Sequence, residues 1–237
     1  IETLAAGSMA LLAAGGHQII LATVTAGDCG SAAAGPAETA KTRKAEAAAA
    51  AALIGAEYLC VGIPDLAVFN DDRTRRLVTE TVRKSRPDIV ITSAVDDYHP
   101  DHEATSILVR DACFAAGAQN YLTGSAAPLT GVPHLYFMDP IGGRGRDGAP
   151  AKPDFAVDIT DWFDIKARML AAHESQADWL LQHHGITDQL ASMRAWSARR
   201  GRDHGVTYAE GFRQYRNQPY PRTAALQELF GAALITV

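Results

Sequence analysis

The feature that most constrains the fold of this chain is a regular alternation of two kinds of segment. Short runs rich in β-branched and apolar residues predict buried strands at 18–25, 58–62, 88–92 and 134–138. Stretches with helical periodicity lie between or beside them, at 3–14, 37–54, 71–85 and 101–115. Strands and helices in this order indicate βαβ units. The sequence therefore predicts an α/β fold: a Rossmann-like, doubly wound, mostly parallel sheet with helices on both faces.

The two ends of the chain add to this expectation. A later strand is predicted at 155–159, and the segment 162–199 is mostly helical in pattern. We expect residues 1–237 to form a single domain. The first predicted element is a helix, whereas the first strand of a doubly wound sheet is usually central. We therefore expect that the natural protein has a strand ahead of Ile1 that the printed sequence lacks.

Composition excludes several classes of function. The formal net charge is -5, which argues against nucleic acid as a partner because such proteins usually carry a basic excess. No apolar stretch is long enough to span a bilayer. Three cysteines without a C-x-x-C pair favour a reducing cytoplasm. The absence of a G-x-G-x-x-G motif predicts no nicotinamide cofactor.

Polar residues gather where the predicted strands end. Asp28 and Cys29 follow the first strand, Asp65 follows the second, and Asp97 with Tyr98 follows the third. Ligands of open α/β sheets bind beyond the carboxyl ends of the strands. We therefore expect the functional site at this edge of the sheet.

The richest of these segments is His99-Pro100-Asp101-His102. Pro100 suits the first turn of a helix, and Asp101 suits a helix start, where N–H groups are unpaired. The helix dipole disfavours protonated imidazole, and neutral imidazole is the form that binds a metal or donates a polarising hydrogen bond. The alternative is that Asp101 only caps the helix and both histidines are solvated. Two histidines flanking an aspartate at a strand end favour the functional interpretation.

The other histidines do not complete a metal site. Zinc in a hydrolase needs about three protein ligands and an open position for water. His17 and His134 lie at strand starts, on the opposite edge, and are interpreted as structural. His183 and His184 are adjacent on a helix and would point about 100° apart, which makes a poor chelating pair.

Two further segments keep open alternatives. The glycine-rich segment 142–148 is either a mobile surface loop or a substrate-covering loop that carries Arg144 and Arg146. The segment His173-Glu174-Ser175-Gln176 either lines the pocket or stabilises helix packing against it.

Together these motifs resemble the LmbE-like/PIG-L family of zinc-dependent N-deacetylases. The family's H-P-D-H motif is found at 99–102 and its H-x-S-Q motif at 173–176. The first residues, I-E-T-L-A-A-G-S, resemble the part of the family's first motif that follows H-P-D-D. Arg43 with Glu46 and the segment Y-A-E-G-F at 208–212 are also similar. The resemblance covers essentially the whole chain.

The resemblance implies roles for individual residues. His102 would be a zinc ligand, His99 would polarise the amide carbonyl or protonate the leaving amine, and Asp101 would orient and tune it. Arg43 and Asp65 would bind the substrate. The first motif's two ligands and its general base have no match in the printed chain, so we expect them ahead of Ile1.

The implied activity is removal of an N-acetyl group from a small substrate such as an N-acetylglucosamine conjugate, with zinc as cofactor. The resemblance also implies a homo-oligomer, a trimer or a hexamer, and no membrane partner. Two alternatives stay open: a hydratase of the same superfamily, and a non-catalytic binding protein on this scaffold. Acetate release separates the first alternative from the deacetylase.

Overall fold

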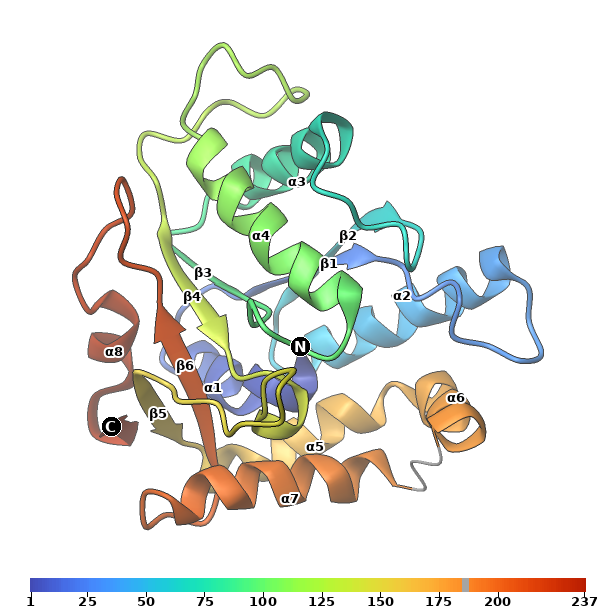
Figure 1. The fold of residues 1–237 in the computed structure, drawn as a ribbon, viewed down its shortest axis with the longest axis vertical. Helices are drawn as coiled ribbons and strands as arrows, with labels where there is room; N and C mark the ends of the chain where they lie inside the picture. The colour runs from blue at the N-terminus through green and yellow to red at the C-terminus, as the bar shows by residue number, and fades with distance from the viewer. Residues whose placement is uncertain (185–187) are drawn as a thin grey trace.

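The computed structural model describes residues 1–184 and 188–237, and within the first range it leaves the side chains of 178 and 181–184 undescribed. The chain alternates strands and helices as the sequence predicts (Figure 1). The strands are β1 (Ile20–Thr25), β2 (Glu57–Ile63), β3 (Ile89–Thr92), β4 (His134–Met138), β5 (Phe155–Asp158), β6 (Ala209–Gln214) and β7 (Leu234–Thr236). The longer helices are α1 (Glu2–Ala14), α2 (Pro36–Ala52), α3 (Asp72–Ser85), α4 (Pro100–Ala115), α5 (Phe163–Ala171), α6 (Glu174–His184) and α7 (Gln189–Arg202).

The strands pair in two groups. β1 pairs with β2 in parallel, and the second group has the order β3-β4-β6-β5-β7. β3 and β4 are parallel, whereas β6 is antiparallel to both β4 and β5, and β7 is antiparallel to β5. The predicted α/β class is confirmed, and the structure adds that the sheet is mixed, because the C-terminal half returns antiparallel strands to it.

Side chains of β4 alternate between two cores, one on each face of the sheet. Tyr136 and Met138 belong to a core shared with α1, α5 and α7. Leu135 and Phe137 belong to a second core shared with α3 and α4. A period of two along a strand places successive side chains on opposite faces. Figure 1 shows α3 beside α4, away from the α5 and α7 pair. Helices therefore cover both faces, as expected.

The sequence did not predict β6 because polar residues interrupt it. Glu210 is nevertheless buried, since its carboxylate lies 2.6 Å from the Lys166 ammonium and accepts the N–H groups of Gly7 and Ser8 at 3.0 and 2.8 Å. A buried charge with an opposite charge and further donors is satisfied. This cluster joins α1, α5 and β6 in the interior. No helix of the described chain combines the length and the apolar character needed to cross a membrane.

Arg83 fixes the far end of α4, the helix that carries the His-Pro-Asp-His segment. Its buried guanidinium, on α3, donates to the backbone carbonyls of Ala116, Tyr121 and Ala118 at 3.0, 3.0 and 2.7 Å. These carbonyls follow the end of α4, where helical acceptors lack intrahelical partners. A cation at this position also complements the helix dipole.

We predict that Arg83→Met lowers the free energy of unfolding by about 3 kcal/mol, because it removes the hydrogen bonds of a buried guanidinium to three carbonyls. Urea unfolding followed by circular dichroism measures this. The matched control is Arg73→Met on the same helix, where the side chain is exposed and the change should stay within about 0.5 kcal/mol. Equal effects of the two substitutions would contradict the role assigned to Arg83.

Candidate active site

Three strand ends bring the candidate residues together. β1 leads to Asp28 and Cys29, β2 leads to Asp65, and β3 leads to the segment 96–102. Hydrogen bonds join the three segments: the Cys29 N–H donates to Asp65 at 3.0 Å, and the Leu66 N–H donates to Asp101 at 2.7 Å. The sheet edge expected from the sequence is therefore one contiguous polar cluster.

The His-Pro-Asp-His segment begins α4 in an unusual way. Pro100 is the first helical residue, as expected. The cap is His99, whose Nδ1 accepts the N–H of Asp101 at 3.2 Å. A nitrogen that accepts a hydrogen bond carries no proton in the neutral ring, so the proton of neutral His99 lies on Nε2. Capping therefore fixes the tautomer of His99.

The two histidine rings stack, with centroids 4.8 Å apart and planes 28° apart. Burial lowers the pKa of His99, and a protonated His102 would lower it further, against the opposing effect of Asp101, Asp97 and Asp65. His99 is thus kept neutral near pH 7, and its Nε2–H is a donor rather than a permanent charge. The Tyr98 ring contacts both histidine rings edge-on, with its centroid 5.7 Å from that of His99 and 5.9 Å from that of His102.

Asp97 is the carboxylate that contacts a histidine ring. Its Oδ1 lies 3.1 Å from His102 Nδ1, and Oδ1 and Oδ2 accept the N–H groups of His99 and Ile141 at 3.2 and 3.0 Å. Burial raises the pKa of Asp97, but the hydrogen bonds from His102 and from the two N–H groups outweigh burial and hold it below its ordinary value. Ionised Asp97 accepts the proton on Nδ1, which leaves Nε2 of His102 with its lone pair free for a ligand.

Asp101 does not contact the His99 ring through its carboxylate. The carboxylate instead accepts the Leu66 N–H at 2.7 Å, and only the backbone N–H of Asp101 meets His99. Leu66 has a positive φ of 62°, a strained conformation for a residue other than glycine. Asp101 thus holds the strained turn after β2 against the start of α4. The carboxylate that contacts a ring of the pair is Asp97, and its ring is His102. An effect of Asp101 on His99 stays a prediction.

Arg43 and Asp65, the expected substrate-binding residues, lie on the same side of the cluster. The Asp65 N–H donates to Asp28 at 2.7 Å, and Arg43 Nη2 donates to the carbonyl of Gly30 at 2.8 Å. Burial lowers the pKa of Arg43 in spite of the opposing charges of Glu46 and Asp65. The structure brings these two residues to the loops that follow β1 and β2, next to the histidine segment.

The glycine-rich loop is tied to the start of α4. Arg146 makes a bidentate ion pair with Glu103, at 2.7 and 2.6 Å, and its N–H donates to Asp96 at 3.0 Å. Glu103 in turn accepts the Asp97 N–H at 2.9 Å. Arg144 has a different partner, the carbonyl of Gly148 at 2.7 Å. Of the two guanidinium groups expected in this loop, one therefore fastens the loop to the histidine segment. Glu103 gave no signal in the sequence analysis.

The H-x-S-Q segment supports packing. Ser175 donates from its N–H and its hydroxyl to Glu46 on α2, at 2.8 and 2.7 Å. His173 Nε2 lies 3.3 Å from Glu2 on α1. Of the two alternatives, these contacts favour the one in which the segment stabilises helix packing beneath the site. His17 is exposed and His134 opens β4 at the opposite edge, as expected. The side chains of His183 and His184 lie outside the described residues.

The described side chains provide part of a zinc site. His102 has the arrangement of a metal-binding histidine, with one nitrogen on a carboxylate and the other free. In the part of the chain that the structure describes, three ligand-type atoms converge within 4.8 Å at Asp28, Cys29 and Asp65, and not around His102. His102 therefore fits one place in a zinc site that needs about three protein ligands.

Comparison with known proteins agrees with the resemblance. Residues 1–113 match the family described as PIG-L: GlcNAc-PI de-N-acetylase. A curated relative, 4-oxalmesaconate hydratase of Pseudomonas putida, is 26% identical over 174 residues, which span 71% of this chain and 64% of that protein. The match thus covers less than two thirds of the relative's length.

Solved structures share the fold over almost the whole chain. A conserved protein of Thermus thermophilus has a TM-score of 0.74 at 26% identity and covers 94% of both chains. The diacetylchitobiose deacetylase of Pyrococcus horikoshii has a TM-score of 0.74 at 23% identity, and the alignment covers 90% of this chain and 79% of the deacetylase chain. The hydratase GalB of Pseudomonas putida has a TM-score of 0.74 at 22% identity, with 94% of both chains covered. This fold thus occurs in both deacetylases and hydratases.

We predict that the Cys29 thiol is alkylated more slowly than an ordinary cysteine at pH 8. Local desolvation raises the pKa of this thiol, and the charges of Asp28, Asp65 and Asp101 raise it further. At pH 8 a smaller fraction of Cys29 is therefore thiolate than in an ordinary cysteine, and the thiolate is the form that reacts. Asp65→Asn removes one of these charges and should speed alkylation by about two- to threefold. Mass spectrometry of iodoacetamide-treated peptides measures the rate at Cys29.

Asp161→Asn is the matched control, because Asp161 is an exposed carboxylate that is not among the groups acting on the thiol. Its rate should equal that of the original protein. An unchanged rate in Asp65→Asn would contradict the electrostatic coupling.

Proposed function

We propose that this protein, whose first 113 residues match the PIG-L family, is a zinc-dependent hydrolase that removes an N-acetyl group from a small substrate such as an N-acetylglucosamine conjugate. One observation carries the proposal. The stacked pair of His99 and His102 has its Nδ1 atoms engaged within the protein, one with a backbone N–H and the other with Asp97. Each ring therefore has one nitrogen left for a ligand, a donor on His99 and an acceptor on His102.

His99 acts on the substrate amide in this proposal. Its Nε2–H donates to the carbonyl oxygen, and this bond strengthens as negative charge develops there in the transition state. The low pKa of His99 makes the ring neutral before reaction. The neutral ring keeps its Nε2–H throughout, and the departing amine takes up the proton that the attacking water releases.

His102 binds the metal in this proposal. Asp97 holds the ring by Nδ1 and increases the electron density at Nε2. When bound, zinc would lower the pKa of a water molecule toward neutrality and polarise the carbonyl. The further ligands that the resemblance implies have no match in the printed sequence. Metal content and activity are therefore measured on the same preparation.

Arg43, Asp65 and Asp101 shape the substrate side of the site. We assign Arg43 and Asp65 to polar groups of the substrate, because Asp65 lies in the loop after β2 and Arg43, on α2, donates to the loop after β1. Asp101 positions the strained turn that presents Asp65. Three free cysteines favour a reducing compartment such as the cytoplasm. Assembly into a trimer or hexamer stays a prediction.

The second candidate function is hydration of a carbon–carbon double bond, because a hydratase is 26% identical over 71% of the chain. The two reactions have different products. A deacetylase releases acetate and a free amine, whereas a hydratase consumes a conjugated double bond and its ultraviolet absorbance without releasing acetate.

We predict that the protein, loaded with zinc, releases acetate from N-acetylglucosamine conjugates, and that dialysis against a chelator abolishes this release. His99→Asn should lower kcat by roughly 10²- to 10³-fold with little change in KM, because it removes the Nε2–H that stabilises the developing oxyanion and leaves the ground-state contacts in place. His17→Asn is the matched control, an exposed histidine, and should keep full activity. Loss of ultraviolet absorbance from a conjugated unsaturated acid, with no acetate released from the N-acetyl substrate, would favour the hydratase. Normal kcat in His99→Asn would overturn the role of His99.

A further inference from the structure

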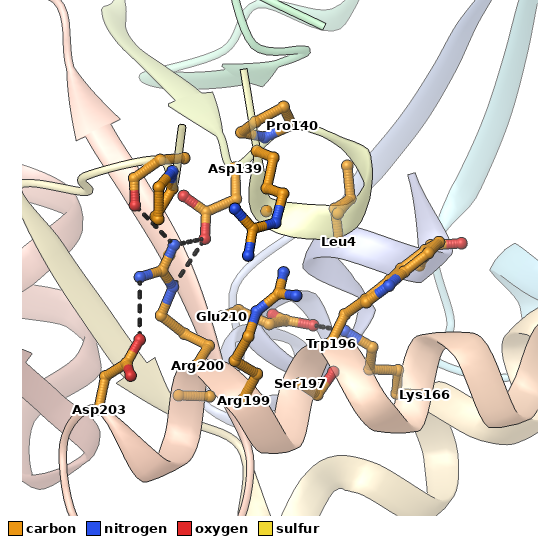
Figure 2. Close-up of a pocket in the computed structure, with 17 residues that line it drawn as sticks. Leu4, Asp139, Pro140, Lys166, Trp196, Ser197, Arg199, Arg200, Asp203 and Glu210 are labelled. Carbon is orange, nitrogen blue, oxygen red and sulfur yellow. Dashed lines mark hydrogen bonds and ion pairs between the residues drawn. The ribbon is translucent and has the colours of Figure 1, made fainter. Parts of the chain in front are cut away.

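A second cavity lies beside the candidate active site, under the glycine-rich loop. Its volume is about 170 Å³, and α7, the start of β6, the start of α1 and the loop 140–151 enclose it. Figure 2 shows Arg199, Arg200 and Trp196 from α7 on one side and Pro140 with Asp139 on the other. The volume corresponds to roughly five or six water molecules, or to one small organic molecule.

The acidic side chains of this cavity already have cationic partners. Asp139 accepts two hydrogen bonds from Arg200, at 2.8 and 2.6 Å. Asp203 lies 3.6 Å from the same guanidinium. Glu210 lies 2.6 Å from Lys166, and Figure 2 shows this pair at the base of the cavity. Lys166 and Arg200 are thus the partners of the three carboxylates.

Two cations of the lining remain. Arg199 donates to the carbonyl of Gly142, and Arg144 donates to the carbonyl of Gly148. Among the described residues, neither guanidinium lies within ion-pair distance of a carboxylate. Both line the cavity, in a chain whose net charge is -5. The lining as a whole holds four cationic side chains and three carboxylates, an excess of one positive charge. Guanidinium is well suited to bind a carboxylate.

The rest of the lining favours an organic anion over an inorganic one. Apolar walls come from Leu4, Pro140, Pro150 and Trp196, which can contact a carbon skeleton. Lys166 is 1% exposed. Its ammonium group has three N–H donors, and one of them donates to Glu210. The base of the cavity therefore supplies a further buried N–H donor.

We propose that this cavity binds a small carboxylic acid, with Arg144 and Arg199 on its carboxylate groups. The site shares no residue with the histidine pair. It is connected to that pair by the loop itself, since the Ile141 N–H donates to Asp97 at 3.0 Å and Arg146 pairs with Glu103. Because Arg144 lies in this loop, an anion in the cavity fastens the loop from its other side.

Isothermal titration calorimetry of the complete protein with succinate tests the proposal. We expect saturable binding of one succinate per chain, with affinity reduced at least tenfold in Arg199→Gln. Arg202→Gln is the matched control: it lies on the same helix, is exposed and does not line the cavity, so its affinity should be unchanged. No binding by the original protein, or equal affinity in Arg199→Gln and Arg202→Gln, would overturn the proposal.

Two more variants and a second anion sharpen the test. Arg144→Gln changes an exposed loop residue, so it tests the site without disturbing the core, and it should also weaken succinate binding at least tenfold. Inorganic phosphate should bind at least tenfold more weakly than succinate; equal affinity would show a general anion site and contradict the carboxylic acid. His99→Asn should bind succinate normally, so failure of the proposed deacetylation leaves this inference separately testable.

Discussion

The arrangement of the site depends on the carboxylate of Asp97. It is almost fully buried, and it joins three elements: the His102 ring, the backbone before α4 and the start of the glycine-rich loop. A buried, ionised carboxylate is costly unless hydrogen-bond donors surround it. Asp97 has such donors, and its carboxylate in turn holds the His102 ring and the two backbone segments in place.

The same interaction determines the chemistry available to the two histidines. His102 donates to Asp97 and keeps Nε2 as an acceptor, whereas His99 accepts at Nδ1 and keeps Nε2–H as a donor. Two rings of identical composition thus take opposite tautomers, because one faces a carboxylate and the other faces a backbone N–H. This division suits a site in which one ring binds a metal and the other polarises a carbonyl.

Much of the fold could be predicted from the sequence, because strands such as His134–Met138 are apolar and helices such as α4 start at recognisable residues. The strand β6 could not be predicted, since the burial of Glu210 depends on Lys166, 44 residues away in the chain. The sheet edge and the histidine pair were predicted from local order. The side chains that contact His102 and Arg146 could not be predicted. These contacts depend on the path of the loops that come back to this edge of the sheet. Nothing in the spacing distinguishes Asp97 from Asp101 as the orienting carboxylate.

The measurement that tests this account most directly is the tautomeric state of the two rings in the metal-free protein, read from long-range ¹⁵N–¹H NMR correlations at pH 7.5, with His99→Asn and His102→Asn used for assignment. The account predicts a proton on Nε2 of His99 and a proton on Nδ1 of His102. The same tautomer in both rings, or the reverse pair, would contradict it.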